Sequence, residues 1–185
     1  AGVMSDLYML ELTNDTNEND LTFVDKTITN IPKSIFRGLK NSVITHFNQK
    51  DIKIIQKVNN KKEYNLSNSI FALGVVTGNN KEKLLDNPND NTEPIYSGKE
   101  VIKYKLLQPK KHIVFDRKNL QQVAPDEVYR APIKLVYKTI NKHIKVAIDT
   151  NQSLTTNSAN IIIPTIVGYD MYVIMGILNS QLYSY

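Results

Sequence analysis

Cysteine and tryptophan are both absent from the sequence, and histidine occurs only three times. Without cysteine the chain forms no disulfide and offers no thiolate to a metal ion. His46, His112 and His143 lie in separate segments, with no Gly-x-Ser-x-Gly turn to present a nucleophilic serine. Only 7 of the 185 residues are glycine, and they form neither a Walker phosphate loop nor a dinucleotide fingerprint. We therefore expect no catalytic residue, no metal ligand and no cofactor site in this chain.

Long apolar runs are missing as well. The longest, near Tyr172 to Leu178, is far shorter than the roughly 20 residues that a transmembrane helix needs. Residues 1–30 lack the basic start and the apolar core of a signal peptide. Together with the missing cysteines, these absences lead us to expect a cytoplasmic protein with no membrane partner.

Charge is distributed unevenly along the chain, whose net charge is +5 and whose isoelectric point is near 9.2. Residues 1–25 contain six acids and no base, whereas residues 26–83 carry a net charge of +8. Residues 84–100 carry −3, residues 101–145 again +8, and residues 146–185 −2. Two basic blocks separated by an acidic loop are compatible with a nucleic-acid partner, and equally with two solvated, lysine-rich faces.

Short strands bracketed by helices are the main structural pattern. A helix is predicted over 35–47, where apolar residues follow the 3.6-residue period and Ser34 is placed to cap it. Runs rich in Val, Ile, Tyr and Thr predict a buried strand over 69–76 that stops at the turn 77–80. The same composition predicts further strands over 51–58, 101–107, 112–115, 133–139, 144–149 and 160–163.

The connections and the last segment complete this pattern. Residues 86–94 are predicted to be a loop, and residues 141–143 a hairpin turn. The segment 170–185 has helical periodicity and stops without a cap, which predicts a truncated C-terminal helix. The fold class that follows is α+β, with a mixed or antiparallel sheet of short strands and flanking helices.

Two short motifs are similar to catalytic signatures. Asp25 followed by Asp51-Ile52-Lys53 fits the loose pattern with which many restriction nucleases hold Mg²⁺ through two carboxylates, although Lys53 on a strand would face solvent. Asn87-Pro88-Asn89 is similar to the Asn-Pro-Pro-aromatic loop of amino-methyltransferases, but it lacks the second proline and the aromatic residue. A Mg²⁺-dependent nuclease domain using Asp25, Asp51 and Lys53 therefore stays open, as does a non-catalytic interaction module.

A set of segments resembles one known family in order and spacing. They are Phe71 to Asn80 (FALGVVTGNN), Pro94 to Tyr104 (PIYSGKEVIKY), Ala131 to Val136 (APIKLV), Ala147 to Asp149 (AID), Thr155 to Ser158 (TTNS) and Leu178 to Leu182 (LNSQL). Together they resemble the TaqI-like C-terminal specificity domain, the target-recognition part of adenine-specific DNA methyltransferases and fused restriction–modification enzymes. One departure is Tyr137-Lys138, where the family often carries arginine.

This resemblance implies a division of the chain and a role for it. Residues 69–185 would be the target-recognition domain, and residues 1–68 a lead-in segment with one helix or a part of the same domain. The chain would bind double-stranded DNA beside the catalytic methyltransferase domain of the same bacterial polypeptide. S-adenosylmethionine is implied for that parent enzyme, and no cofactor for this chain.

In that implied role, basic side chains would hold DNA by its phosphates, and polar side chains in turns would read base edges. The predicted phosphate contacts are Lys81, Lys83, Arg117, Lys118, Arg130, Lys138, Lys142 and Lys145. The predicted base contacts are Asn79, Asn80, Thr156 and Asn157. For Gly74, Gly78, Gly98 and Asn157, a role in turns and packing is an equally good interpretation.

Overall fold

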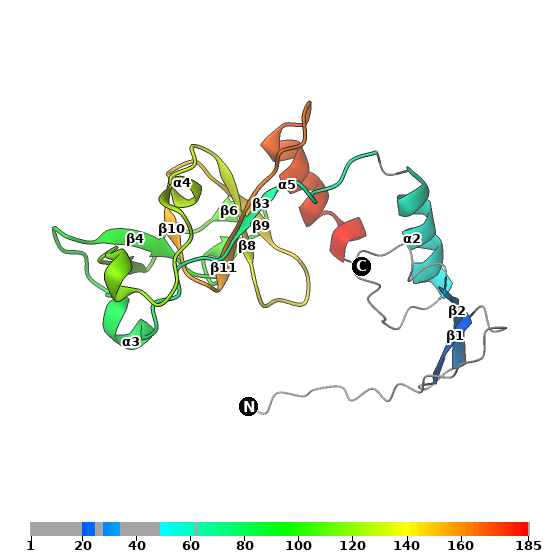
Figure 1. Cartoon of the computed structure of the whole chain (residues 1–185), viewed down its shortest axis with the longest axis horizontal. Coiled ribbons are helices and arrows are strands. Elements are labelled where there is room, and N and C mark those ends of the chain that lie inside the picture. Colours follow the sequence, from blue (N-terminus) through cyan, green and yellow to red (C-terminus); the bar gives the residue numbers. More distant parts are fainter. Residues whose placement is uncertain (1–19, 25–27, 34–48, 62, 185) are drawn as a thin grey trace. The chain divides into compact units, whose positions relative to one another are not determined.

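The computed structural model describes residues 20–24, 28–33, 49–61 and 63–184 (Figure 1). The chain divides into two compact units, residues 1–62 and residues 63–185. Whether the first unit acts as a lead-in segment or belongs to the same functional domain stays a prediction. Within the described ranges, no helix is long and apolar enough to cross a membrane.

The first unit contains a β-hairpin and a helix. Strands β1 (Asp20–Val24) and β2 (Ile28–Pro32) pair antiparallel, and α2 spans Gln49–Lys61. The strand predicted over 51–58 is therefore wrong. Its β-branched residues favour strands only weakly, and isoleucines three positions apart also suit one helix face, with Ile52 buried. The helix predicted over 35–47, with Ser34 as its cap, lies outside the described residues.

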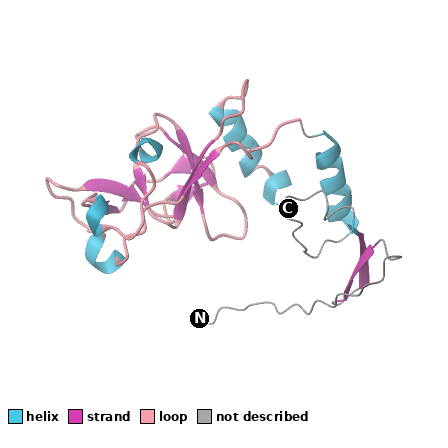
Figure 2. Ribbon diagram, viewed as in Figure 1, coloured by secondary structure: helices cyan, strands magenta, loops and turns pink. Residues whose placement is uncertain are grey.

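The second unit is built around a four-stranded antiparallel sheet with the order β3-β11-β8-β9 (Figures 1 and 2). Its strands are β3 (Ile70–Ala72), β8 (Lys134–Lys138), β9 (Val146–Asp149) and β11 (Ala159–Ile163). Helix α5 (Met171–Asn179) packs on one face, where Ile174, Met175 and Leu178 meet Leu135, Val146 and Ile162. The predicted hairpin between 133–139 and 144–149 is confirmed by the antiparallel pairing of β8 with β9.

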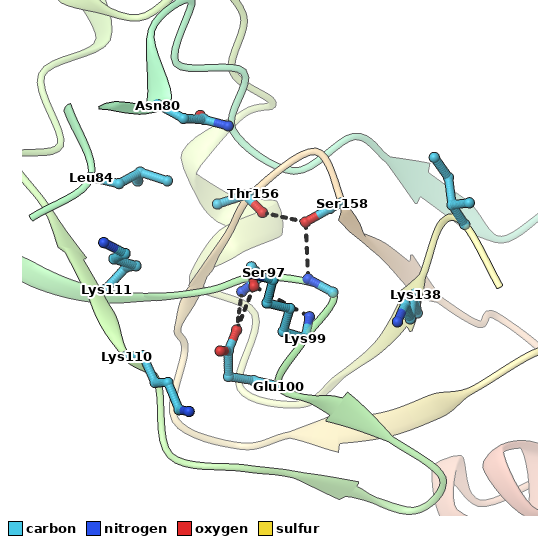
Figure 3. A pocket seen from close by; sticks show the side chains of 12 residues that line it. Asn80, Leu84, Ser97, Lys99, Glu100, Lys110, Lys111, Lys138, Thr156 and Ser158 are labelled. Carbon is cyan, nitrogen blue, oxygen red and sulfur yellow. Dashed lines mark hydrogen bonds between the residues drawn. The ribbon is translucent and has the colours of Figure 1, made fainter. Parts of the chain in front are cut away.

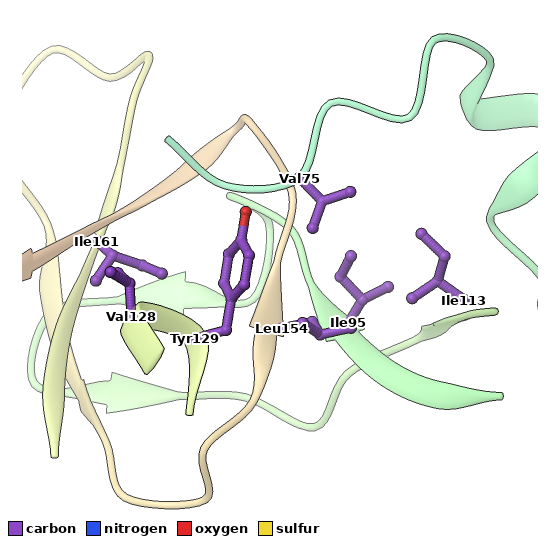
Figure 4. Close-up of a cluster of buried hydrophobic side chains, with 7 residues drawn as sticks. All are labelled: Val75, Ile95, Ile113, Val128, Tyr129, Leu154 and Ile161. Atoms are coloured by element: carbon purple, nitrogen blue, oxygen red, sulfur yellow. The ribbon is translucent and has the colours of Figure 1, made fainter. Parts of the chain in front are cut away.

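A second, three-stranded sheet has the order β10-β4-β7. Strand β4 (Glu93–Tyr96) pairs parallel with β10 (Leu154–Thr155) and antiparallel with β7 (Lys111–Ile113). The largest buried cluster joins this sheet to the first one, and Figure 4 shows its side chains: Val75, Ile95, Ile113, Val128, Tyr129, Leu154 and Ile161. The predicted α+β class, with mixed and antiparallel sheets of short strands, is confirmed.

Short elements precede or follow the strands of the two sheets. They are α3 (Asn80–Lys83), β5 (Val101–Ile102), β6 (Lys105–Leu106), η2 (Arg117–Asn119), α4 (Asp126–Tyr129) and η3 (Gln181–Ser184). The strand predicted over 101–107 is in fact the β5–β6 hairpin, turned by Tyr104 at a φ of 70°. The strand predicted over 69–76 shortens to an edge strand with Ile70 and Phe71 exposed, and the chain then leaves the sheet near Gly74.

The C-terminal helix is present but ends at Asn179, whereas the sequence predicted helix to residue 185. The buried side chain of Asn179 pairs with the edge strand β9 as a neighbouring strand would. Its Oδ1 accepts from Val146 N at 3.0 Å, and its Nδ2 donates to Val146 O at 2.7 Å. Its own carbonyl accepts from Lys103 Nζ at 2.8 Å. These bonds fix the helix end, and the chain turns at Ser180 into η3.

An ion pair is buried between β8 and β9. Lys134 Nζ lies 2.5 Å from Asp149 Oδ2, and both side chains have 0% exposure. Lys134 also donates to Tyr129 O at 2.6 Å, and Asp149 accepts from Ser153 N at 2.9 Å and from Asn151 N at 2.8 Å. Burial lowers the pKa of the Lys134 ammonium, and its hydrogen bond to Asp149 opposes that shift. Each charge is thus balanced by its partner and by further hydrogen bonds.

We expect Lys134→Met to lower the free energy of unfolding by about 3–5 kcal/mol, because it leaves a buried carboxylate without its cation. Urea denaturation measures this loss. The matched control is Lys111→Met, which breaks the exposed Lys111–Asp86 pair and should lower stability by no more than about 1 kcal/mol. Equal losses in the two variants would contradict a structural role for the buried pair.

Candidate functional site

An open cleft of about 400 Å³ lies where five segments of the second unit meet (Figure 3). These segments are α3, the β4–β5 turn, the loop before β7, the end of β8 and the β10–β11 turn. The lining residues are Asn80, Leu84, Ser97, Gly98, Lys99, Glu100, Lys110, Lys111, Lys138, Ile140, Thr156 and Ser158. Lysines and hydroxyl groups from segments far apart in the sequence are thereby gathered in one place.

The β4–β5 turn forms one wall of this cleft. Glu100 is buried, and its Oε2 accepts from Ser97 N at 2.8 Å and from Ser97 Oγ at 2.6 Å. Gly98 N donates to Ser158 Oγ at 2.9 Å, and that hydroxyl lies 2.9 Å from Thr156 Oγ1 (Figure 3). The one carboxylate of the cleft is therefore occupied inside its own turn, while the side chain of Lys99 is exposed.

The cleft has a strong excess of positive charge. Four lysines line it against the single acid Glu100. Lys111 pairs with Asp86 at 2.6 Å, whereas the ammonium groups of Lys99, Lys110 and Lys138 have no ion-pair or hydrogen-bond partner among the described residues. A concave surface with several unpaired cations and nearby hydroxyl groups attracts anions. Its chemistry suits phosphate groups.

Three of the predicted contact residues line the cleft, namely Asn80, Lys138 and Thr156. Asn80 Oδ1 accepts from Thr77 Oγ1 at 2.6 Å, which leaves its amide nitrogen available. Thr156 is only 3% exposed, and its hydroxyl already contacts Ser158. Lys145, another predicted contact, is half-buried, and its carbonyl accepts a bond from Lys138 N at 3.1 Å. Thr139 N donates to Ser158 O, also at 3.1 Å, which joins the start of the β8–β9 loop to the β10–β11 turn.

Three other predicted cations are bound to the protein itself. Lys83 Nζ donates to Thr77 O at 2.9 Å and to Asn119 O. Arg117 pairs with Asp126 and donates to Ala124 O at 3.0 Å. Arg130 pairs with Glu93 at 2.8 Å, donates to Gln152 O at 3.0 Å and lies 5.8 Å from the ring centre of Phe115. These contacts give all three side chains a structural role, whatever else they bind.

The remaining predicted residues lie on the surface. Lys81, Lys118, Lys142 and Asn157 are exposed. Asn79 occupies the N-cap position of α3 without a side-chain capping bond, and its Nδ2 donates to Glu82 Oε2 at 3.0 Å. Whether any of them contacts a ligand stays a prediction. The sequence interpretation missed Ser97, Lys99, Lys110, Lys111 and Ser158. The lysine pair that follows Pro109 is a visible signal in the sequence, whereas Lys99 stands in it as a single lysine beside Gly98.

The motifs that suggested a nuclease lie elsewhere. Asp51 and Lys53 both lie on α2, so the strand placement assumed for Lys53 is wrong, and Asp25 lies outside the described residues. Across the described ranges, no three His, Asp or Glu side chains are grouped so that they could hold a metal ion.

Comparison with known proteins gives one family. The family model described as the TaqI-like C-terminal specificity domain matches residues 93–185, half of the chain. The match contains every cleft-lining residue except Asn80 and Leu84, and the segment Phe71 to Asn80 lies before it. No curated protein matches the chain.

We expect Gly98→Ala to destabilise the fold by about 1–3 kcal/mol, as overpacking does. A Cβ at Gly98 would lie 2.5 Å from the backbone oxygen of Ser158, which cannot yield without moving the β10–β11 turn. The matched control is Gly176→Ala on α5, where a Cβ meets nothing within 4 Å and alanine should stabilise the helix by up to about 1 kcal/mol. Thermal unfolding should therefore shift in opposite directions, and a shared direction would argue against the close contact.

Proposed function

Because the chain belongs to the family of TaqI-like C-terminal specificity domains, we propose that it binds a short duplex DNA site through its lysine-lined cleft. In this proposal the parent protein is an adenine-specific DNA methyltransferase of a restriction–modification system. The chain holds and orients the DNA, and a catalytic domain outside it transfers the methyl group. The observation that supports this role best is the gathering of unpaired lysines inside the region that matches the family.

In the proposed parent enzyme, one domain modifies the base and another surface holds the duplex. An enzyme that modifies a base first takes that base out of the stack, so another surface must hold the duplex meanwhile. Lysines do so by neutralising phosphates and releasing counterions, which fixes the position of the DNA. Lys99, Lys110 and Lys138 are the side chains that would make these contacts, with the exposed Lys142 as a further candidate.

S-adenosylmethionine fits the parent enzyme better than this chain. Its reactive sulfonium is a cation, and four lysines line the cleft, so the charge of the cleft opposes it. The methyl donor would therefore be held by the catalytic domain. What this chain contributes is binding and orientation of DNA.

Selection from randomised duplexes tests the proposal directly. The chain is incubated with duplexes at near-physiological salt, and the bound DNA is recovered and sequenced over several rounds. We expect enrichment of one short site that contains an adenine. Binding that disappears at modest salt, with no enriched sequence, would contradict a specificity role, because non-specific binding is almost wholly electrostatic.

Two single variants test whether the cleft lysines contact phosphates. For Lys99→Gln and for Lys138→Gln, we expect the slope of log Kobs against log salt concentration to become less steep by about 1, because each removes one phosphate contact. Affinity should fall by the same factor for all sequences. Fluorescence anisotropy at several salt concentrations measures both quantities.

The matched control is Lys105→Gln, because Lys105 is an exposed lysine on β6 that does not line the cleft. Its salt slope should stay at the value of the unaltered chain. A slope change in Lys105→Gln as large as in the two cleft variants would place the DNA elsewhere on the surface.

A further inference from the structure

The loop between β8 and β9 combines an exposed apolar side chain with basic neighbours. Its residues 139–145 include Lys142 and Lys145, and Lys138 immediately precedes it. Ile140 in this loop is 86% exposed and also lines the lysine cleft. Figure 1 shows the loop, in yellow, extending beyond the two strands. An isoleucine so placed lies next to the very groups that would bind a DNA backbone.

The base of this loop is firmly held by the protein. Thr139 N donates to Ser158 O, and Thr139 Oγ1 donates to Asn157 O, both at 3.1 Å. Ile144 packs against the core cluster under α5, and Asn141 Nδ2 donates to His143 O inside the loop. The residues on both sides of Ile140 are therefore held by contacts with the protein, while the side chain of Ile140 itself stays exposed.

We propose that this loop enters the major groove of the bound duplex and that Ile140 contacts the C5 methyl group of a thymine. This inference rests on the function proposed above. The major groove is wide enough for a β-ribbon, and the thymine methyl is the one apolar group among the base edges there. When Lys99 and Lys138 bind phosphates of the DNA backbone, the major groove beside those phosphates would lie next to the loop, because both lysines line the same cleft as Ile140.

In this proposal, one set of residues positions the DNA and another residue recognises its base sequence. The lysines contact a backbone that is the same in every duplex, whereas a methyl contact distinguishes thymine from the other three bases. Ile140 was not among the base contacts predicted from the sequence, which were all polar. It would make the chain selective through buried apolar surface rather than through a hydrogen bond.

The test couples a protein variant to a DNA variant. The site selected by the unaltered 185-residue chain is resynthesised with deoxyuridine in place of each thymine in turn, which removes only the methyl group. Binding is measured for the unaltered chain, for Ile140→Ala and for the control Val167→Ala. Val167 is an equally exposed β-branched residue, at 88%, that does not line the cleft.

We expect one thymine at which deoxyuridine weakens binding of the unaltered chain by about fourfold, the effect of leaving one methyl group unburied. At that position, the replacement of thymine by deoxyuridine should not change the affinity of Ile140→Ala. The same replacement should weaken binding of Val167→Ala about fourfold, as it does for the unaltered chain. The salt slope of Ile140→Ala should be unchanged, because no charge is removed. Unchanged thermal unfolding would show that the variant folds normally.

The outcomes separate the two proposals. If the unaltered chain enriches no site, the specificity function fails and this inference fails with it. If a site is enriched but no thymine in it is coupled to Ile140, the DNA-binding function stands and the inference is overturned. Coupling at one thymine, absent from the Val167→Ala control, is the result that supports it.

Discussion

Lys134 and Asp149 face each other with no exposure to solvent, and the arrangement of the second unit depends on this contact. Removing two charges from water is expensive unless their remaining donors and acceptors are also satisfied. The satisfying groups here are Tyr129 O at the end of α4 and the backbone N–H groups of Asn151 and Ser153. One ion pair thereby joins β8 and β9 to α4 and orders the chain that leads into β10, an edge strand of the second sheet.

The turn that follows β10 is fixed against the cleft by close packing of backbone on backbone. The turn after β10 lies between two glycines: a Cβ at Gly74 would be 2.1 Å from Thr156 O, and one at Gly98 would be 2.5 Å from Ser158 O. Only residues without a Cβ permit so close an approach of backbone to backbone. The hydroxyls of Thr156 and Ser158 are thus set against the β4–β5 turn, and Lys99 is held at the edge of the same cleft. The interpretation of both glycines as packing residues is confirmed.

The fold class, most strands of the second unit and the family could be predicted from the sequence, because alternation, turn residues and ordered motifs are local signals. The failures have identifiable causes. The sequence predicts a strand where α2 forms, because its isoleucines suit both structures. The length of the element would distinguish a helix from a strand, but that length is known only from the structure. The end of α5 depends on Asn179 bonding to Val146, and the break after Ala72 depends on the approach of Thr156 to Gly74. Both are contacts between residues far apart in sequence, which no local pattern contains.

The candidate site was harder to predict than the fold, for a related reason. Formal charge does not distinguish a lysine that binds a ligand from one that binds its own chain. Lys83, Arg117 and Arg130 are as basic as Lys99 and Lys138, but carbonyl and carboxylate groups from other segments occupy them. What marks Lys99, Lys110 and Lys138 is that the one acid lining their cleft, Glu100, is buried and bonded to Ser97, so it forms no ion pair with them. The positive charge of this surface is therefore a property of tertiary structure: it arises where the fold places lysines without the carbonyl or carboxylate partners that Lys83, Arg117 and Arg130 have.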